Sequence, residues 1–78
     1  MIEKLNNALA DEYEVPISEI LPESDIWQTL NLDSMRAMQI IIIIKQLFGV
    51  LIKPHVLQRM VTFADLYELI LEKYQMTI

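Results

Sequence analysis

Residues 31–49 read NLDSMRAMQIIIIIKQLFG, and this stretch decides how the rest of the chain folds. Asp33 is a good N-cap, because its carboxylate can accept a hydrogen bond from a free N–H in the first helical turn. Gly49 is the only glycine of the chain, and a glycine just past an apolar segment favours a left-handed C-cap. The stretch therefore predicts a helix over residues 34–48, with Ser34 at its first position.

Five consecutive isoleucines at residues 40–44 favour a strand, because β-branched side chains suit a pleated sheet. The flanking segments SMRAMQ and KQLF consist mostly of helix formers, and both cap signals fit a helix. We therefore expect a helix here. A helix with isoleucine on all sides cannot bury every one of them, so some apolar surface should remain exposed.

Apolar residues at helical spacing predict a first helix over residues 2–13. The long connection that follows, residues 14–33, contains eight apolar side chains and can pack through them. We expect a short helical turn around residues 18–21, with Ser18 as its cap. Trp27 should tie this connection to the core.

Pro54 is a natural first residue for a short helix over residues 54–60. Thr62 and Asp65 form a capping-box pattern, which should open a last helix that ends near residue 74. The sequence therefore predicts an all-α fold, a small four-helix bundle of three main helices plus a short third helix. The expected core contains Leu5, Leu9, Ile40, Ile41, Ile44, Phe48, Phe63, Leu66 and Ile70, and the last helix should also turn Tyr67, Leu71 and Tyr74 inward.

The length of 78 residues predicts a single domain over residues 1–78. The chain has no cysteine, which excludes disulfides and thiolate metal sites. The first residues carry acids where a signal peptide needs a basic region and an apolar run. The isoleucine run is far shorter than the roughly 20 residues of a membrane span. We expect a cytoplasmic protein without membrane insertion.

The net charge of −5 is unevenly distributed. Residues 1–33 hold eight acids and one lysine, a net −7, whereas residues 34–64 hold four basic residues and no acid. The acidic total argues against nucleic-acid binding. The local asymmetry indicates a basic surface around the helix of residues 34–48.

Ser34 is a candidate reactive residue without a visible activating base. A serine hydroxyl is a weak nucleophile unless a histidine or a similar group accepts its proton. The only histidine, His55, lies on another predicted helix, and we expect it to be a surface residue. The chain therefore lacks the parts of an enzyme active site. On these residues alone, the better explanation of Ser34 is that it helps to cap a helix.

Three motifs together change this interpretation. Their residues and spacing resemble those of the acyl carrier protein family, and the resemblance covers nearly the whole chain. They are Leu32-Asp33-Ser34-Met35, Phe48-Gly49, and Thr62-Phe63 with Asp65. In that family the serine after the aspartate carries 4′-phosphopantetheine, which a separate phosphopantetheinyl transferase attaches and whose thiol holds acyl or aminoacyl groups as thioesters. The resemblance implies that Ser34 is the attachment site and that Asp33 and Met35 complete the motif. It also implies acyl-loading and acyl-processing enzymes as partners.

The sequence departs from the family in the helix after the serine. Common fatty-acid-synthesis carriers have an acidic helix here, which docks on basic patches, but this chain has Arg36, Gln39 and Lys45. A specialised lipid or secondary-metabolite pathway, such as polyketide biosynthesis, therefore fits better than housekeeping fatty acid synthesis. Two alternatives remain open: an aminoacyl or D-alanyl carrier, for which the LDSM form is also seen, and an unmodified helical interaction module of the same fold.

Met35, Met38 and Ile42 follow one another at spacings of three and four, so they should form one ridge that starts beside Ser34. With Arg36 and Gln39 at its side, this ridge is our candidate docking surface for partner enzymes. The alternative is that these side chains fold back over the connection that contains Trp27. We expect the protein to be a monomer.

Overall fold

The computed structural model describes residues 2–76, none of which belongs to a β-strand. The predicted all-α fold is confirmed, and the four predicted helices correspond to α1, α3, α4 and α5. The connection after α1 adds two short elements, a 3-10 helix η1 and the one-turn helix α2. In chain order the elements are α1 (Ile2–Tyr13), η1 (Ile17–Glu19), α2 (Ile26–Thr29), α3 (Ser34–Phe48), α4 (Pro54–Gln58) and α5 (Phe63–Met76).

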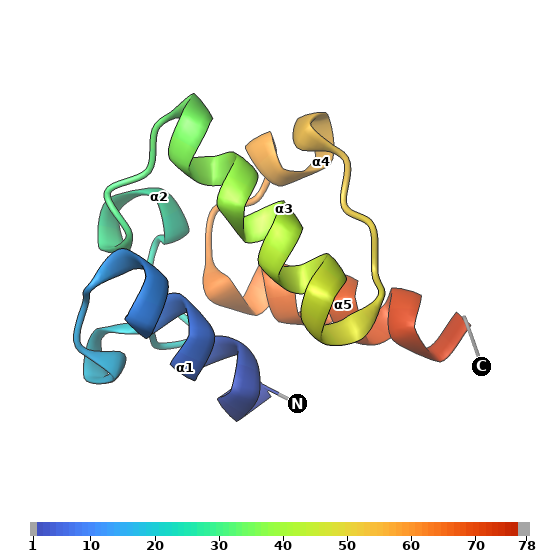
Figure 1. Ribbon diagram of the computed structural model, residues 1–78, viewed down its shortest axis with the longest axis horizontal. Helices are drawn as coiled ribbons and strands as arrows, with labels where there is room; N and C mark the ends of the chain where they lie inside the picture. Colours follow the sequence, from blue (N-terminus) through green and yellow to red (C-terminus); the bar gives the residue numbers. More distant parts are fainter. Residues whose placement is uncertain (1, 77–78) are drawn as a thin grey trace.

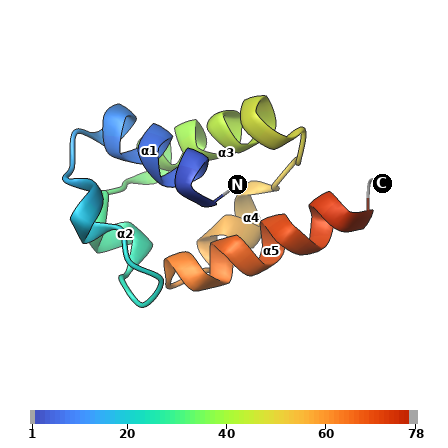
Figure 2. The same ribbon diagram turned by 90° about the horizontal axis from the view of Figure 1, so that it is seen from below.

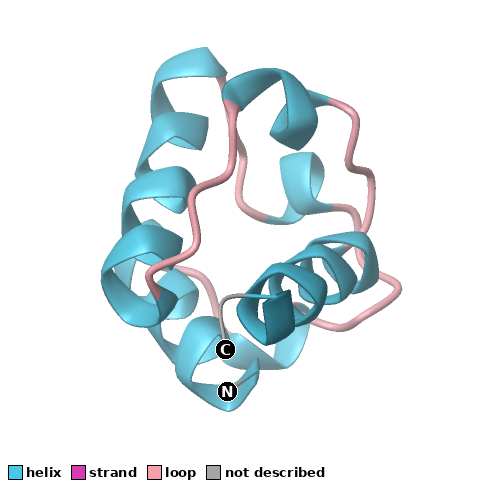
Figure 3. Ribbon diagram, turned by 90° about the vertical axis from the view of Figure 1, so that its right-hand side faces the viewer, coloured by secondary structure: helices cyan, strands magenta, loops and turns pink. Residues whose placement is uncertain are grey.

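Helices α1 and α3 lie side by side and run in opposite directions, while α5 crosses the other side of the molecule (Figures 1 and 2). The short α4 fills the space between α3 and α5 (Figure 2). Seen along the length of the molecule, the helices surround a common interior, and the loops run around the outside (Figure 3). This arrangement leaves the first turn of α3 at the upper edge of the molecule in Figure 1, on the same side as α4.

The bounds of α3 are those that its cap residues predict. The Arg36 N–H donates to Oδ1 of Asp33 at 2.7 Å, which satisfies one of the free N–H groups of the first turn. Gly49 has φ 69°, and its N–H donates to the carbonyl of Lys45 at 2.9 Å. Both ends of the helix are therefore fixed by local contacts of single residues.

The isoleucine run divides between core and surface, as a helix requires. Ile40, Ile41 and Ile44 are buried, Ile43 is half-buried, and Ile42 is exposed. Ile40 and Ile44 lie one helical turn apart and therefore share the buried side of the helix. The buried core is formed by Leu5, Leu9, Tyr13, Ile20, Ile26, Leu30, Ala37, Ile40, Ile41, Ile44, Val50, Ile52, Leu57, Met60, Phe63, Leu66, Tyr67 and Ile70.

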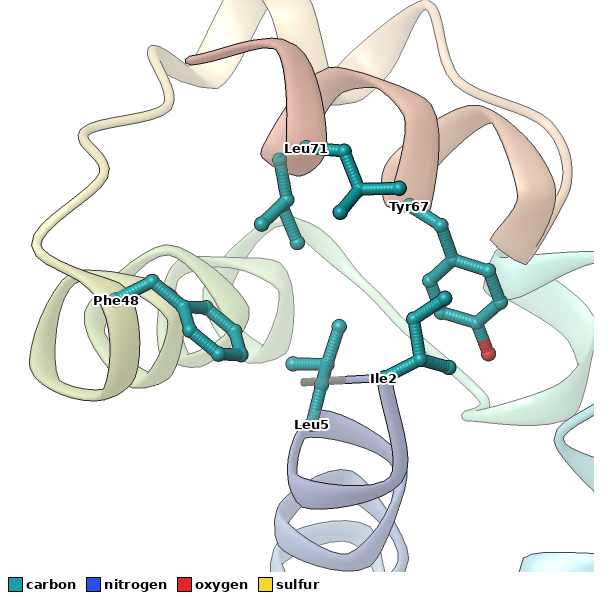
Figure 4. A pocket seen from close by; sticks show the side chains of 6 residues that line it. Ile2, Leu5, Phe48, Tyr67 and Leu71 are labelled. Atoms are coloured by element: carbon teal, nitrogen blue, oxygen red, sulfur yellow. The ribbon is translucent and has the colours of Figure 1, made fainter. Parts of the chain in front are cut away.

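Phe48 is half-buried and packs at the edge of the core, so its prediction as a core residue was too strong. It is the last residue of α3, and its ring meets Tyr74 edge-on with 6.4 Å between the ring centres. Side chains from the ends of α1, α3 and α5 point toward one another here, with Phe48 facing Leu5 and Leu71 (Figure 4). Leu71 and Tyr74 each keep 37% of their surface exposed, so the apolar stripe of α5 is narrower than predicted.

The connection between α1 and α3 differs most from the prediction. The expected turn begins earlier, at Ile17 after Pro16, and Ser18 makes no cap hydrogen bond. Helix α2 was not predicted from the sequence, and its N-cap Asp25 accepts a hydrogen bond from the Gln28 N–H at 2.9 Å. A four-residue helix is too short to show apolar periodicity, which explains the omission.

The last two helices follow their start signals but not their predicted ends. Helix α4 begins at Pro54 and ends at Gln58, two residues early, although Met60 is buried as expected. The capping box opens α5: the Thr62 N–H donates to Oδ2 of Asp65 at 3.1 Å, and the Asp65 N–H donates to Oγ1 of Thr62 at 3.3 Å. None of the described helices is long and apolar enough to cross a membrane.

Candidate functional site

Ser34 is the first residue of α3, and it is exposed. The Asp33 carboxylate accepts a hydrogen bond from the Arg36 N–H, whereas the N–H groups of Ser34 and Met35 have no acceptor among residues 2–76. Two free N–H groups and the positive end of a four-turn helix dipole therefore surround the serine hydroxyl. This environment favours a negatively charged group attached there.

An apolar groove of about 160 Å³ opens beside the serine, between α2, the first half of α3 and α4. None of the side chains that form it carries a charge, and most of its wall is hydrocarbon. The lining residues are Trp27, Ser34, Ala37, Met38, Ile41, Pro54, Leu57 and Gln58. The groove is large enough for a few methylene groups or a short apolar chain.

Trp27 forms a fixed wall of this groove. Its indole Nε1–H donates to the carbonyl of Met60 at 3.1 Å, across 33 residues of sequence. The preceding residue, Ile26, is fully buried and donates its N–H to the carbonyl of Val61 at 2.8 Å. The prediction that Trp27 ties the connection to the core is confirmed, and the tryptophan holds the serine end of the molecule against α4.

A family model described as the phosphopantetheine attachment site matches residues 3–70, which include α3 and the groove. The chain belongs to this family. It is similar to an acyl carrier protein of Coprothermobacter proteolyticus, at 33% identity over 70 residues that cover 90% of this chain and 85% of the relative. An acyl carrier protein of Thermosynechococcus vestitus is 27% identical over 73 residues, covering 94% of this chain and 90% of the relative.

The family resemblance seen in the three sequence motifs is thereby confirmed, and the chain is a carrier rather than an enzyme. His55 is exposed on α4 and is not among the residues that line the groove beside Ser34. No cluster of metal-binding side chains occurs in the part of the chain that the structure describes. Carriers of this family work with a modifying transferase and with acyl-processing enzymes.

The first turn of α3 is also held from the side of α1, by a contact that sequence reasoning missed. The Tyr13 hydroxyl donates to the carbonyl of Arg36 at 2.6 Å, and the Arg36 guanidinium lies 5.3 Å from the centre of the Tyr13 ring. The same guanidinium donates to the carbonyl of Leu30 at 3.5 Å. Burial raises the pKa of Tyr13 to about 12, so its hydroxyl stays protonated and remains a donor.

Arg36 therefore points toward α1, on the opposite flank of α3 from the groove. Met35, Met38 and Ile42 occupy the outward side of the helix, with 81%, 46% and 46% of their surfaces exposed. Met38 also lines the groove with Trp27, so it contributes to both surfaces. Of the predicted site residues, the structure brings Ser34, Met35 and Met38 together and separates the Arg36 side chain from them.

Proposed function

We propose that this carrier holds acyl groups as thioesters on a 4′-phosphopantetheine arm attached to Ser34. The observation that carries the proposal is the exposed Ser34 hydroxyl, which stands at the start of α3 beside an uncharged groove. The other two serines differ from it in this respect, because Ser18 lies within η1 and Ser24 lies in the loop before α2. Neither of them begins a helix.

The residues around Ser34 fit the phosphodiester that this attachment leaves. The free N–H groups of Ser34 and Met35 are available to it, and the helix terminus favours such an anion by about 0.3–1 kcal/mol at an exposed position. Asp33 shapes the turn by capping α3, so the serine is held in a defined position. The arm would supply a terminal thiol, which this cysteine-free chain does not contain.

The attachment reaction needs a base that the chain does not provide. The Ser34 oxygen forms a bond to the phosphorus next to pantetheine in coenzyme A, and the bond from that phosphorus to the adenosine bisphosphate breaks. The serine proton passes to a base of the transferase. Because this step requires coenzyme A and a transferase, we place the carrier in the cytoplasm with these two partners, as a monomer.

The groove favours an acyl cargo over an aminoacyl cargo. Its lining contains no carboxylate that would balance the ammonium group of an aminoacyl thioester, and burying an unpaired charge is unfavourable. The absence of acids from residues 34–64 supports a specialised lipid or secondary-metabolite pathway rather than a partner set that recognises an acidic helix.

Intact mass after incubation with coenzyme A and a promiscuous phosphopantetheinyl transferase tests the proposal. We expect one phosphopantetheinyl addition on the native chain and on Ser24→Ala, which serves as the matched control. We expect none on Ser34→Ala. Full addition on Ser34→Ala would disprove the assignment of the site, and no addition on the native chain would favour the unmodified interaction module.

A further inference from the structure

Arg36 lies in the first turn of α3, where a positive charge is unfavourable for the helix itself. The structure holds it there through its backbone and its side chain. Its N–H donates to Oδ1 of Asp33 at 2.7 Å, and its carbonyl accepts from the Tyr13 hydroxyl at 2.6 Å. Its guanidinium lies 5.3 Å from the centre of the Tyr13 ring and donates to the carbonyl of Leu30 at 3.5 Å. Arg36 therefore ties the first turn of α3 to α1 and to the end of α2.

Both residues that hold the Arg36 side chain stand at fixed helix ends. Tyr13 is the last residue of α1, and Leu30 is the C-cap of α2. Each is followed by a residue in the left-handed region, Glu14 with φ 55° and Asn31 with φ 52°. In both cases the next N–H along the chain donates to a carbonyl five residues earlier, at 3.1 and 2.9 Å, which closes the helix end. The two contacts of Arg36 are therefore made to well-defined points.

Ser34 lies inside the turn that these contacts hold. It and Met35 are the two residues between Asp33 and Arg36, and their N–H groups have no acceptor among residues 2–76. The turn is fixed at its first end by the Asp33 carboxylate and at its second end by the contacts of Arg36. The position of the exposed serine therefore depends on both ends, and the Tyr13 hydroxyl fixes the second end from α1.

We propose that Tyr13 is a positioning residue for phosphopantetheinyl transfer to Ser34, acting through the Arg36 carbonyl. This inference rests on the proposed function, since it concerns the attachment step. In that step the Ser34 oxygen bonds to the phosphorus, the bond from phosphorus to the adenosine bisphosphate breaks, and a base of the transferase accepts the serine proton. The attacking oxygen must be aligned with the bond that breaks, and small misplacements of reacting atoms slow such reactions strongly.

Two other roles of the Tyr13 hydroxyl predict different behaviour. A contact with the transferase is ruled out by burial, because only 7% of the Tyr13 surface is exposed. A purely stabilising role has a matched comparison in Tyr67, which is 6% exposed and whose hydroxyl donates to Asn6 of α1, also at 2.6 Å. That bond joins α1 to α5 and does not involve the first turn of α3. A hydroxyl that only stabilises the fold would act alike at both positions.

Initial rates of transfer from coenzyme A, measured against carrier concentration, test the proposal. Native protein, Tyr13→Phe and Tyr67→Phe are compared at a temperature where circular dichroism shows all three to be folded. Phenylalanine keeps the ring and removes only the hydroxyl. Tyr13→Phe should lower kcat at least about fivefold and leave KM within about twofold of native, because a misaligned serine affects the chemical step and not binding. Tyr67→Phe should have native kcat and KM.

A second pair of variants removes one positive charge each and tests the same turn without touching the core. Arg36→Met removes the guanidinium from Tyr13 and Leu30 and should lower kcat at least about threefold. Arg59→Met is its control, because Arg59 is exposed at the C-cap of α4. Its kcat should be native. This pair decides the question if Tyr13→Phe does not fold.

A native kcat for Tyr13→Phe or for Arg36→Met would overturn the positioning role. An equal loss in Tyr67→Phe would do the same, since it would reduce the effect to stability. So would a raised KM with native kcat in Tyr13→Phe, which would indicate a role in binding the transferase. If all variants are modified at the native rate, the proposed function stands and only the positioning role fails, whereas a native chain that is never modified removes the function itself.

Discussion

Asp33 and Asp25 cap α3 and α2 with the same geometry, in which Oδ1 accepts a hydrogen bond from the N–H three residues later, at 2.7 and 2.9 Å. Only Asp33 stands next to Ser34. Substituting each aspartate in turn therefore separates the effect of a helix cap on stability from its effect on phosphopantetheinyl transfer to Ser34.

Replacing either aspartate by alanine should lower the free energy of unfolding by about 1 kcal/mol, as loss of an N-cap does. Asp33→Ala should in addition slow phosphopantetheinyl transfer, because the first turn of α3 is no longer fixed. Asp25→Ala should be modified at the native rate under conditions where both proteins are folded. Urea denaturation and transfer rates check this pair, and equal rates for the two variants would argue against a positioning role of Asp33.

Asp65 should make the stability depend on pH in the acidic range. The N–H groups of Thr62 and Val61 donate to its carboxylate and lower its pKa below the ordinary value of 3.8. A pKa that is lower in the folded state stabilises the protein above the unfolded value, and this contribution is lost as the pH falls through the folded value. Asp65→Asn should therefore be less stable than native near neutral pH.

The difference in melting temperature between native protein and Asp65→Asn should shrink as the pH falls below about 4. Comparing the two proteins removes the contribution of the other carboxylates, which titrate in both. A difference that is constant from neutral pH to strongly acidic conditions would contradict the role of the ionised capping box.

At the scale of the element, α3 was predictable because each of its signals is local. Its caps involve the residues directly at its ends, Asp33 and Gly49, and the flanking helix formers outweigh the β-branched run. Helix α2 was not predictable, since it is held by contacts with a segment more than 30 residues away, including the Trp27 bond to Met60. Short elements depend on tertiary packing, which the spacing of residues does not show.

Ile44 and Ile42 test the orientation of α3 with one pair of substitutions. Ile44 is fully buried and Ile42 is 46% exposed on the same helix. Ile44→Ala should lower the free energy of unfolding by about 2–5 kcal/mol. Ile42→Ala should change it by no more than about 0.5 kcal/mol, as for a surface position. Denaturant unfolding measures both, and a reversed order would mean that the helix is rotated.

At the scale of the whole molecule, α1 holds the bundle together at two points. The Tyr67 hydroxyl on α5 donates to Oδ1 of Asn6 on α1 at 2.6 Å, and Tyr13 at the end of α1 binds the first turn of α3. Both tyrosines fit the apolar spacing of their helices, so sequence patterns place their rings in the core. The hydroxyl partners lie 61 and 23 residues away, and no sequence pattern identifies them.

Tyr67→Phe should cost about 0.5–1.5 kcal/mol of stability, the usual net value of one hydrogen bond. Asn6→Ala should lose the same interaction. A double-mutant cycle should then show that the two losses are not additive, because both variants remove one bond. Additive losses would mean that the Tyr67 hydroxyl and the Asn6 side chain do not interact in solution.

Ser34 stands out in the sequence as the proposed attachment residue for a different reason, since it combines a local cap signal with motifs that extend to Asp65. Its groove was not predictable, because Trp27, Met38 and Leu57 come together only when α2, α3 and α4 pack. The sequence alone is enough to propose Ser34, whereas the shape of the space beside it depends on the whole fold.

The thiol content of the protein tests the central claim most directly, because the chain contains no cysteine. Titration of the denatured protein with a thiol reagent should detect no thiol before incubation with coenzyme A and transferase. After incubation and removal of free coenzyme A, it should detect one thiol per native chain and none in Ser34→Ala. A native chain that remains free of thiol, or a Ser34→Ala chain that gains one, would contradict the attachment of the arm at Ser34.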